Sequence, residues 1–217
     1  MRFEKLQFNL LNKNEMVDKS KSLYLEALKR RSVREFSNKD IPLSVLKTLI
    51  KTAASAPSGA NKQPWHFVIV KSKKLKKEIR IAAEKEERAF YNHRATKEWK
   101  KDLDPFNVTW EKPFLEDAPG LIVVFKKIYN LEGKKKSKNY YVSESVGIAC
   151  GFLILAIHNV GLVCLPHTPS PMGFLENILE RPKNERAFLL IPVGYPAKET
   201  LVPNIKKKPF EEICSVK

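Results

Sequence analysis

Apolar positions recur at helical spacing in several stretches of the chain, which predicts helices with a buried face. After Pro42, leucine and isoleucine recur with this spacing until the run Ala56-Pro57-Ser58-Gly59 introduces a loop. Residues 73–94 predict a long charged helix, and residues 96–103 continue it after a break. The other predicted helices cover residues 15–29, 140–159 and 173–180.

Short apolar runs between these helices predict strands. The run 121–125 is apolar at every position, as expected of a strand that is buried on both faces of a sheet. The other predicted strands are residues 65–70, 162–165 and 187–193. Strands and helices alternate, but several helices are longer than a simple crossover needs. We therefore expect an α+β (α/β-like) fold with a mixed sheet, and a single domain over residues 1–217.

One stretch has the length and composition of a membrane-spanning helix. No Asp, Glu, Lys or Arg occurs from Val146 to Pro166. Asn159 and Gly161 interrupt it, however, because this pair is typical of a helix end. The pattern favours a buried helix, a turn and a core strand, so we expect no membrane span.

The formal net charge of +16 favours anionic partners, although charge clusters are usually solvated surface. The lysine runs lack interleaved aromatic residues, so binding of nucleic acid is the least favoured hypothesis and we expect no nucleic-acid partner. The three cysteines form no CxxC pair and no signal peptide precedes them, which indicates a cytoplasmic protein without disulfides. The four histidines have no metal-ligand spacing, so no metal site is expected.

Two segments could hold a phosphate-bearing ligand. Arg30-Arg31-Ser32-Val33-Arg34 offers guanidinium groups that suit a terminal phosphate, although basic residues at a helix end also satisfy the helix dipole. The loop 56–61 has small residues that let backbone amides approach a ligand. Neither a GxGxxG fingerprint nor a P-loop occurs. From local chemistry alone, the first segment is equally well explained as a charged helix end, and the second as a surface loop.

A third candidate site combines Glu87, Tyr91 and Lys112. Glu87 and Tyr91 are four residues apart on a predicted helix and share a face. Lys112 follows the loop that contains Pro105. A carboxylate, a phenol and an ammonium that converge there could bind an amino acid's zwitterion, but in isolation each is an ordinary surface residue.

Taken together, these segments resemble motifs of the nitroreductase-type FMN flavoproteins. The resemblance covers about residues 27–210 and rests on residues 30–36, on Ala56 to Trp65 and on Pro192-Val193-Gly194-Tyr195-Pro196. Within that superfamily, residues 87–91, Trp99 and Trp110-Glu111-Lys112 resemble the active-site lid of the iodotyrosine deiodinases, here about residues 84–115. Generic nitroreductases lack the Glu-Tyr-Lys trio.

The resemblance implies a fold, a cofactor and an assembly. The fold would be a central mixed, mainly antiparallel sheet flanked by helices. Two chains would intertwine as a homodimer, each extending a C-terminal arm (about residues 197–217) onto its partner, with FMN at the interface. The implied activity is FMN-dependent reductive dehalogenation of halotyrosines, with NAD(P)H or another reductant as electron source. A broad NAD(P)H-dependent nitroreductase or flavin reductase is the alternative.

The resemblance also implies roles for individual residues. In the substrate site, Glu87 would bind the ammonium, Lys112 the carboxylate, Tyr91 would close on both, and the Ala60 N–H would bind the phenolate. Thr168 would hydrogen-bond the flavin N5 as the catalytic contact. The flavin-binding residues would be Arg30, Arg31, Ser32, Arg34, Pro57, Ser58, Pro166, His167, Thr168 and Lys207.

Two positions depart from the family's pattern. Lys207 stands where the family usually has an arginine, so a phosphate contact would lose its bidentate fork. Pro166 and His167 stand where hydroxyl residues are more usual, although Thr168 is retained.

Overall fold

The computed structural model describes residues 3–133 and 135–217, and the chain divides into two compact units. The first unit ends at Arg31 and contains α1 (Lys13–Lys29), which confirms the helix predicted over residues 15–29. A capping box starts this helix: the Asn12 side chain accepts from the Glu15 N–H at 3.0 Å, and Glu15 accepts from the Asn12 N–H at 2.9 Å. None of the α1 residues is buried within the chain.

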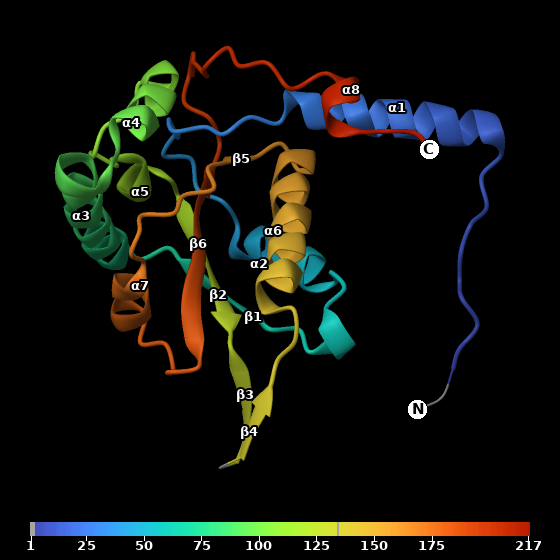
Figure 1. The fold of residues 1–217 in the computed structure, drawn as a ribbon, viewed down its shortest axis with the longest axis horizontal. Helices are drawn as coiled ribbons and strands as arrows, with labels where there is room; N and C mark the ends of the chain where they lie inside the picture. Colours follow the sequence, from blue (N-terminus) through green and yellow to red (C-terminus); the bar gives the residue numbers. More distant parts are fainter. Residues whose placement is uncertain (1–2, 134) are drawn as a thin grey trace. The chain divides into compact units, whose positions relative to one another are not determined.

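The second unit, Ser32–Lys217, is built on a four-stranded sheet with the order β1-β2-β6-β5 (Figure 1). The named strands pair antiparallel throughout, and one isolated parallel bridge joins Ser32 to Cys164. The expected mixed, mainly antiparallel sheet is therefore antiparallel except at this bridge. The strands are β1 (Trp65–Val70), β2 (Gly120–Lys127), β5 (Val163–Cys164) and β6 (Glu185–Gly194).

Alternate side chains of β2 enter two separate hydrophobic cores. Ile122 and Val124 point into the core that includes α2 (Leu43–Ala54) and α6 (Val142–Asn159). The intervening side chains of β2, such as Val123, belong to the core formed with α3 (Lys73–Ala89), α5 (Phe114–Asp117) and α7 (Gly173–Ile178). Because side chains alternate along a strand, both faces of β2 are buried, as its continuous apolar run predicts. Figure 1 shows these two groups of helices on opposite faces of the sheet.

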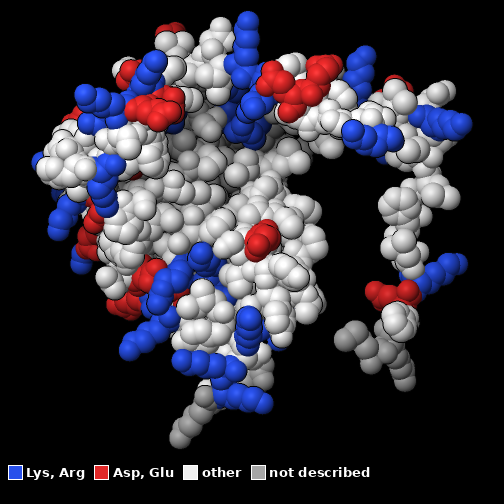
Figure 2. Space-filling view, viewed as in Figure 1, with Lys and Arg blue, Asp and Glu red and all other residues white. Residues whose placement is uncertain are grey.

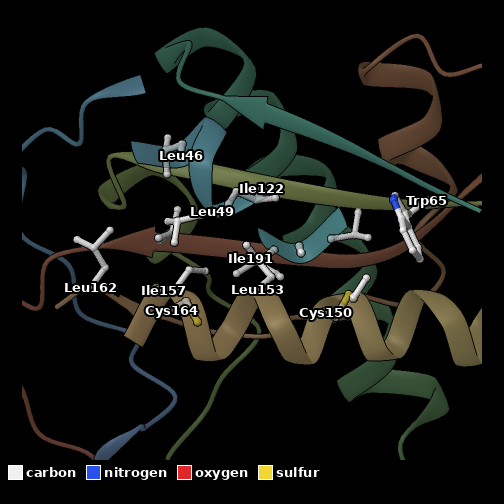
Figure 3. Close-up of a cluster of buried hydrophobic side chains, with 14 of the residues drawn as sticks. Leu46, Leu49, Trp65, Ile122, Cys150, Leu153, Ile157, Leu162, Cys164 and Ile191 are labelled. Atoms are coloured by element: carbon white, nitrogen blue, oxygen red, sulfur yellow. The ribbon is translucent and has the colours of Figure 1, made fainter. Parts of the chain in front are cut away.

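Helix α6 supplies much of the first core. Figure 3 shows Cys150, Leu153 and Ile157 pointing toward Ile122 and Ile191 of the sheet. The helix is long and apolar enough to cross a membrane by length and composition, a property that buried core helices share. Its other face leaves apolar side chains exposed: Ile148, Phe152 and Leu155, with Val160 just beyond the helix end.

The structure adds elements that the hydrophobic pattern did not predict. A hairpin of β3 (Tyr129–Glu132) and β4 (Lys135–Lys138) follows β2. It is lysine-rich, and Figure 2 shows basic side chains gathered there. Asparagine side chains anchor its base: Asn139 donates to the Lys127 carbonyl and Asn184 to the Tyr129 carbonyl, each at 2.8 Å. The other additions are the short helix α5, the 3-10 turns Gly59–Asn61 and Asp104–Phe106, and α8 (Phe210–Ile213).

Candidate active site

The predicted charged helix 73–94 changes form near its end. It is α-helical as α3 until Ala89 and continues as the π-helical turn η2 (Phe90–Arg94), in which the Ala95 N–H donates to the Phe90 carbonyl at 2.8 Å. The Phe90 ring packs edge-on against Trp99, 4.9 Å between centroids, on the following helix α4 (Lys97–Leu103). Single π-turns are frequent at functional sites, and this one carries Tyr91.

The segment 108–113 returns to α3 and η2 and brings Lys112 to Glu87. The Lys112 Nζ lies 3.1 Å from the Glu87 Oε2 and donates to the Thr109 carbonyl. Lys112 is only 5% exposed, which is rare for a lysine without a partner. The Tyr91 hydroxyl donates to the Val108 carbonyl at 3.4 Å, and the Lys112 ammonium lies 5.7 Å from the Tyr91 ring centroid. The predicted Glu87–Tyr91–Lys112 trio is therefore assembled.

Burial shifts the pKa values of Lys112 and Tyr91 in opposite directions, and neighbouring charges modify both shifts. Burial lowers the pKa of Lys112, and the Glu87 carboxylate partly offsets that effect. Burial, followed by Glu87, raises the pKa of Tyr91, while the Arg34 guanidinium opposes the rise. The trio thus places a carboxylate and an ammonium 3.1 Å apart beside the phenol, with the Arg34 guanidinium nearby.

The trio forms one wall of a cavity of about 770 Å³. Residues that follow β5 also line it, namely Leu165, Pro166, His167 and Thr168. Arg34 also lines it, because the extended segment after Ser32 runs beside β5: the Val33 N–H donates to the Cys164 carbonyl at 3.2 Å. The predicted site residues that the cavity brings together are Arg34, Glu87, Tyr91, Lys112, Pro166, His167 and Thr168.

His167 is the most strongly perturbed of these residues. Burial, then the nearby Lys112 and Arg34 cations, lower its pKa to about 3. Its ring packs edge-on against Phe114 at 5.3 Å, and its backbone exchanges hydrogen bonds with Leu190. The Nε2 atom is enclosed by protein and has no hydrogen-bond partner among the described residues. The imidazole is therefore neutral and held in place by packing.

Other predicted site residues do not line this cavity. Pro57, Ser58 and Ala60 lie in the loop after α2, where Ala60 has a left-handed conformation with φ of 50°. Ser58 accepts from the Gln63 N–H at 2.9 Å, so its hydroxyl organises the loop. A non-glycine residue in this conformation is uncommon and is associated with functional sites. Lys207 is exposed in the C-terminal arm.

Arg30 and Arg31 belong to the first unit, and their predicted role at the flavin phosphate stays a prediction, as does that of Ser32.

Sequence reasoning missed Glu84, which accepts from the Lys112 backbone N–H at 2.8 Å. It also missed the Arg88 guanidinium stacked over the Trp110 ring at 4.0 Å. Spacing was the available signal, since Glu84, Glu87, Arg88 and Tyr91 follow one helical stripe.

A family model described as the Nitroreductase family matches residues 27–195. The chain belongs to the nitroreductase family. It is 58% identical over 195 residues to an iodotyrosine deiodinase of Haliscomenobacter hydrossis, which covers 89% of this chain and 88% of that relative. Human iodotyrosine deiodinase 1 is 43% identical over 201 residues, covering 92% of this chain and 70% of that protein.

A solved structure agrees with these matches. The crystal structure of an oxidized iodotyrosine deiodinase bound to FMN and 3-iodo-L-tyrosine matches this nitroreductase-family chain with a TM-score of 0.77 and 36% identity. The match covers 87% of this chain and 96% of that chain. The predicted nitroreductase fold and the resemblance to iodotyrosine deiodinases are therefore confirmed.

Proposed function

We propose that this nitroreductase-family protein is an FMN-dependent oxidoreductase that reductively dehalogenates halotyrosines. One observation carries the proposal: Glu87, Tyr91 and Lys112 converge on the wall of a single cavity, with a 3.1 Å contact between carboxylate and ammonium. High similarity to iodotyrosine deiodinases supports the same activity. A broad nitroreductase or flavin reductase would need no such pair.

The ion pair suits a zwitterionic amino acid. Glu87 would accept hydrogen bonds from the substrate ammonium, and Lys112 would donate to its carboxylate. In the chain alone these groups neutralise one another, so binding would exchange one internal ion pair for two pairs with the ligand. Tyr91 closing on both groups would exclude water, which strengthens each polar contact because the local dielectric falls.

The cavity fits a flavin in size and in donors. Its volume lies within the usual range of about 300–1,000 Å³ for cofactor sites. Arg34 would hold the flavin phosphate or ring edge, and the Thr168 hydroxyl would donate to the flavin N5. Bound FMN would supply the two electrons needed when the ring carbon of the substrate takes a proton and halide leaves. The protein's part is to stack and orient the ring.

We also propose that the working form is a homodimer. The loop that carries Pro57, Ser58 and Ala60 does not line the cavity with Thr168, so a second copy could bring the two parts of the flavin site together. Apolar side chains exposed on α6 and along the arm, such as Phe152 and Phe210, give that contact a hydrophobic surface. Lys207, in the same arm, would then reach the phosphate.

We propose NAD(P)H as the reductant and the cytoplasm as the location. The cysteines support a reducing compartment, since no disulfide joins Cys150, Cys164 or Cys214 in the part of the chain that the structure describes.

Flavin fluorescence tests the function directly. Oxidised protein loaded with FMN is titrated with diiodotyrosine, which should quench the flavin strongly and release iodide once the flavin is reduced. Glu87→Gln and Lys112→Gln should each weaken diiodotyrosine binding by roughly a hundredfold, since removing the charge of one partner leaves the other charge buried and unpaired. Glu98→Gln and Lys100→Gln, both on the exposed surface of α4, are matched controls. Indifference to diiodotyrosine with fast nitroaromatic turnover would instead favour the alternative.

A further inference from the structure

The segment 108–112 is attached to one stripe of α3 and η2. Glu84, Glu87, Arg88 and Tyr91 lie at positions i, i+3, i+4 and i+7, so they share a face of the helix. Each makes a different contact with the returning segment. In order, these are the Lys112 N–H, the Lys112 ammonium, the Trp110 ring and the Val108 carbonyl.

Within this stripe, Glu84 is the residue that accepts a hydrogen bond from the backbone N–H of Lys112 itself. Its Oε1 receives the Lys112 N–H at 2.8 Å and also the Arg80 Nε at 2.7 Å. Arg80 in turn lies 3.6 Å from the Glu116 carboxylate on α5, the helix that follows Lys112. The Glu84 side chain is only 16% exposed, which favours a persistent hydrogen bond over a surface contact.

The function proposed above makes this backbone hydrogen bond significant. When a substrate ammonium takes the Glu87 carboxylate, Lys112 loses its side-chain ion pair and must still present its Nζ to the substrate carboxylate. The bond from Glu84 to the Lys112 backbone is unaffected by that exchange. It therefore fixes where the lysine side chain starts, with and without ligand.

We infer that Glu84 is a positioning residue for the zwitterion site: it anchors the Lys112 backbone on α3 so that the ammonium stays directed at the substrate carboxylate. It touches neither substrate nor flavin. The inference rests on the proposed function for its ligand, but the anchoring itself is a property of the chain alone. It predicts that Glu84 matters for ligands with an amino-acid head group and not for halophenols.

Two variants separate anchoring from charge. Glu84→Gln keeps an oxygen that can accept from the Lys112 N–H. Glu84→Leu introduces a side chain of similar size that has no acceptor. We expect Glu84→Leu to weaken diiodotyrosine binding by roughly tenfold and Glu84→Gln by less than about threefold, in line with the loss of one buried hydrogen bond. Binding of 2-iodophenol and of FMN should stay at the wild-type level in both. Glu78→Leu, which removes a carboxylate of the same helix that lies before the lid and outside the stripe, is the control.

Hydrogen exchange of the peptide that spans residues 108–115 provides a readout that needs no ligand. Glu84→Leu should exchange faster there than wild type, and Glu84→Gln should not. Unchanged exchange in Glu84→Leu would overturn the inference, as would an equal loss of diiodotyrosine, iodophenol and FMN binding. If wild type shows no preference for diiodotyrosine over iodophenol, the proposed function fails, and the exchange result still decides whether Glu84 anchors the segment.

Discussion

At the scale of residues, the cavity brings together charged side chains that are largely buried: Lys112 is 5% exposed and the Glu87 side chain 14%. Lys112 and Arg34 place two cations beside one carboxylate, Glu87, and beside the His167 ring. A third cation there would be costly, so the imidazole stays neutral although it has an ordinary pKa near 6.5 when exposed. A polar residue that must remain uncharged next to a flavin site is a source of pH sensitivity.

His167 should make the stability of the protein depend on pH. Its folded pKa of about 3 lies below the ordinary value of 6.5, so the unfolded chain takes up the proton first as pH falls. The stabilisation is therefore complete above pH 6.5 and is lost progressively toward pH 3, at up to about 1.4 kcal/mol per pH unit. His167→Gln removes the titration while keeping a polar side chain.

The measurement is urea unfolding of both proteins between pH 4 and pH 7. The difference between their unfolding free energies should shrink as the pH is lowered, because only wild type loses stability through this group. Parallel pH profiles would show that the imidazole titrates normally in the folded protein.

At the scale of elements, Gly194 sets how closely β6 can approach its surroundings. A Cβ there would lie 2.6 Å from the Pro119 Cδ and 2.9 Å from the Phe36 ring. Neither group can swing away, because the proline ring is fixed to the backbone and the Phe36 ring is buried in the core. This close packing aligns the end of β6 with the segment 32–36, and thus with Arg34 at the cavity.

Gly194→Ala should therefore destabilise the protein by about 1–3 kcal/mol through overpacking. Chemical denaturation followed by tryptophan fluorescence measures the change. Gly173→Ala is the matched control, since a Cβ at that position meets no atom within 4 Å. Equal stability of the two variants would mean that the strand end shifts without cost.

At the scale of the whole molecule, the apolar side chains exposed on α6 are suited to contact with a second copy of the chain. Phe152 is 42% exposed on a helix whose opposite face forms the core. If α6 meets a second copy, an aspartate there would place an unpaired charge in a hydrophobic interface. Flavin binding should fall together with dimerisation, because the proposed flavin site draws on both copies.

Sedimentation equilibrium tests this expectation. Wild type should be a dimer at micromolar concentration, and Phe152→Asp should be largely monomeric with FMN affinity lowered at least tenfold. Ile81→Asp, at an exposed apolar position on α3, should leave both properties unchanged. A monomeric wild type that binds FMN stoichiometrically would contradict the proposal.

Patterns with a short period were readable without a structure. The apolar run in β2 predicted a strand buried on both faces, and the helical period located α2 and α6 closely. The spacing of Glu87 and Tyr91 placed them on one face, as the structure confirms. The β3–β4 hairpin was missed because asparagine side chains anchor its base while its strands carry lysine, so no apolar alternation marks it.

The order and spacing of the motifs were enough to identify the family, and the residue types able to bind a zwitterion are visible in the printed chain. The contact of Lys112 with Glu87, the hydrogen bond from its backbone to Glu84, and the cavity lining after β5 became visible in the folded chain. The reason is physical: helical and strand periods act over a few residues, whereas burial of an ion pair depends on segments that the chain brings together from far apart.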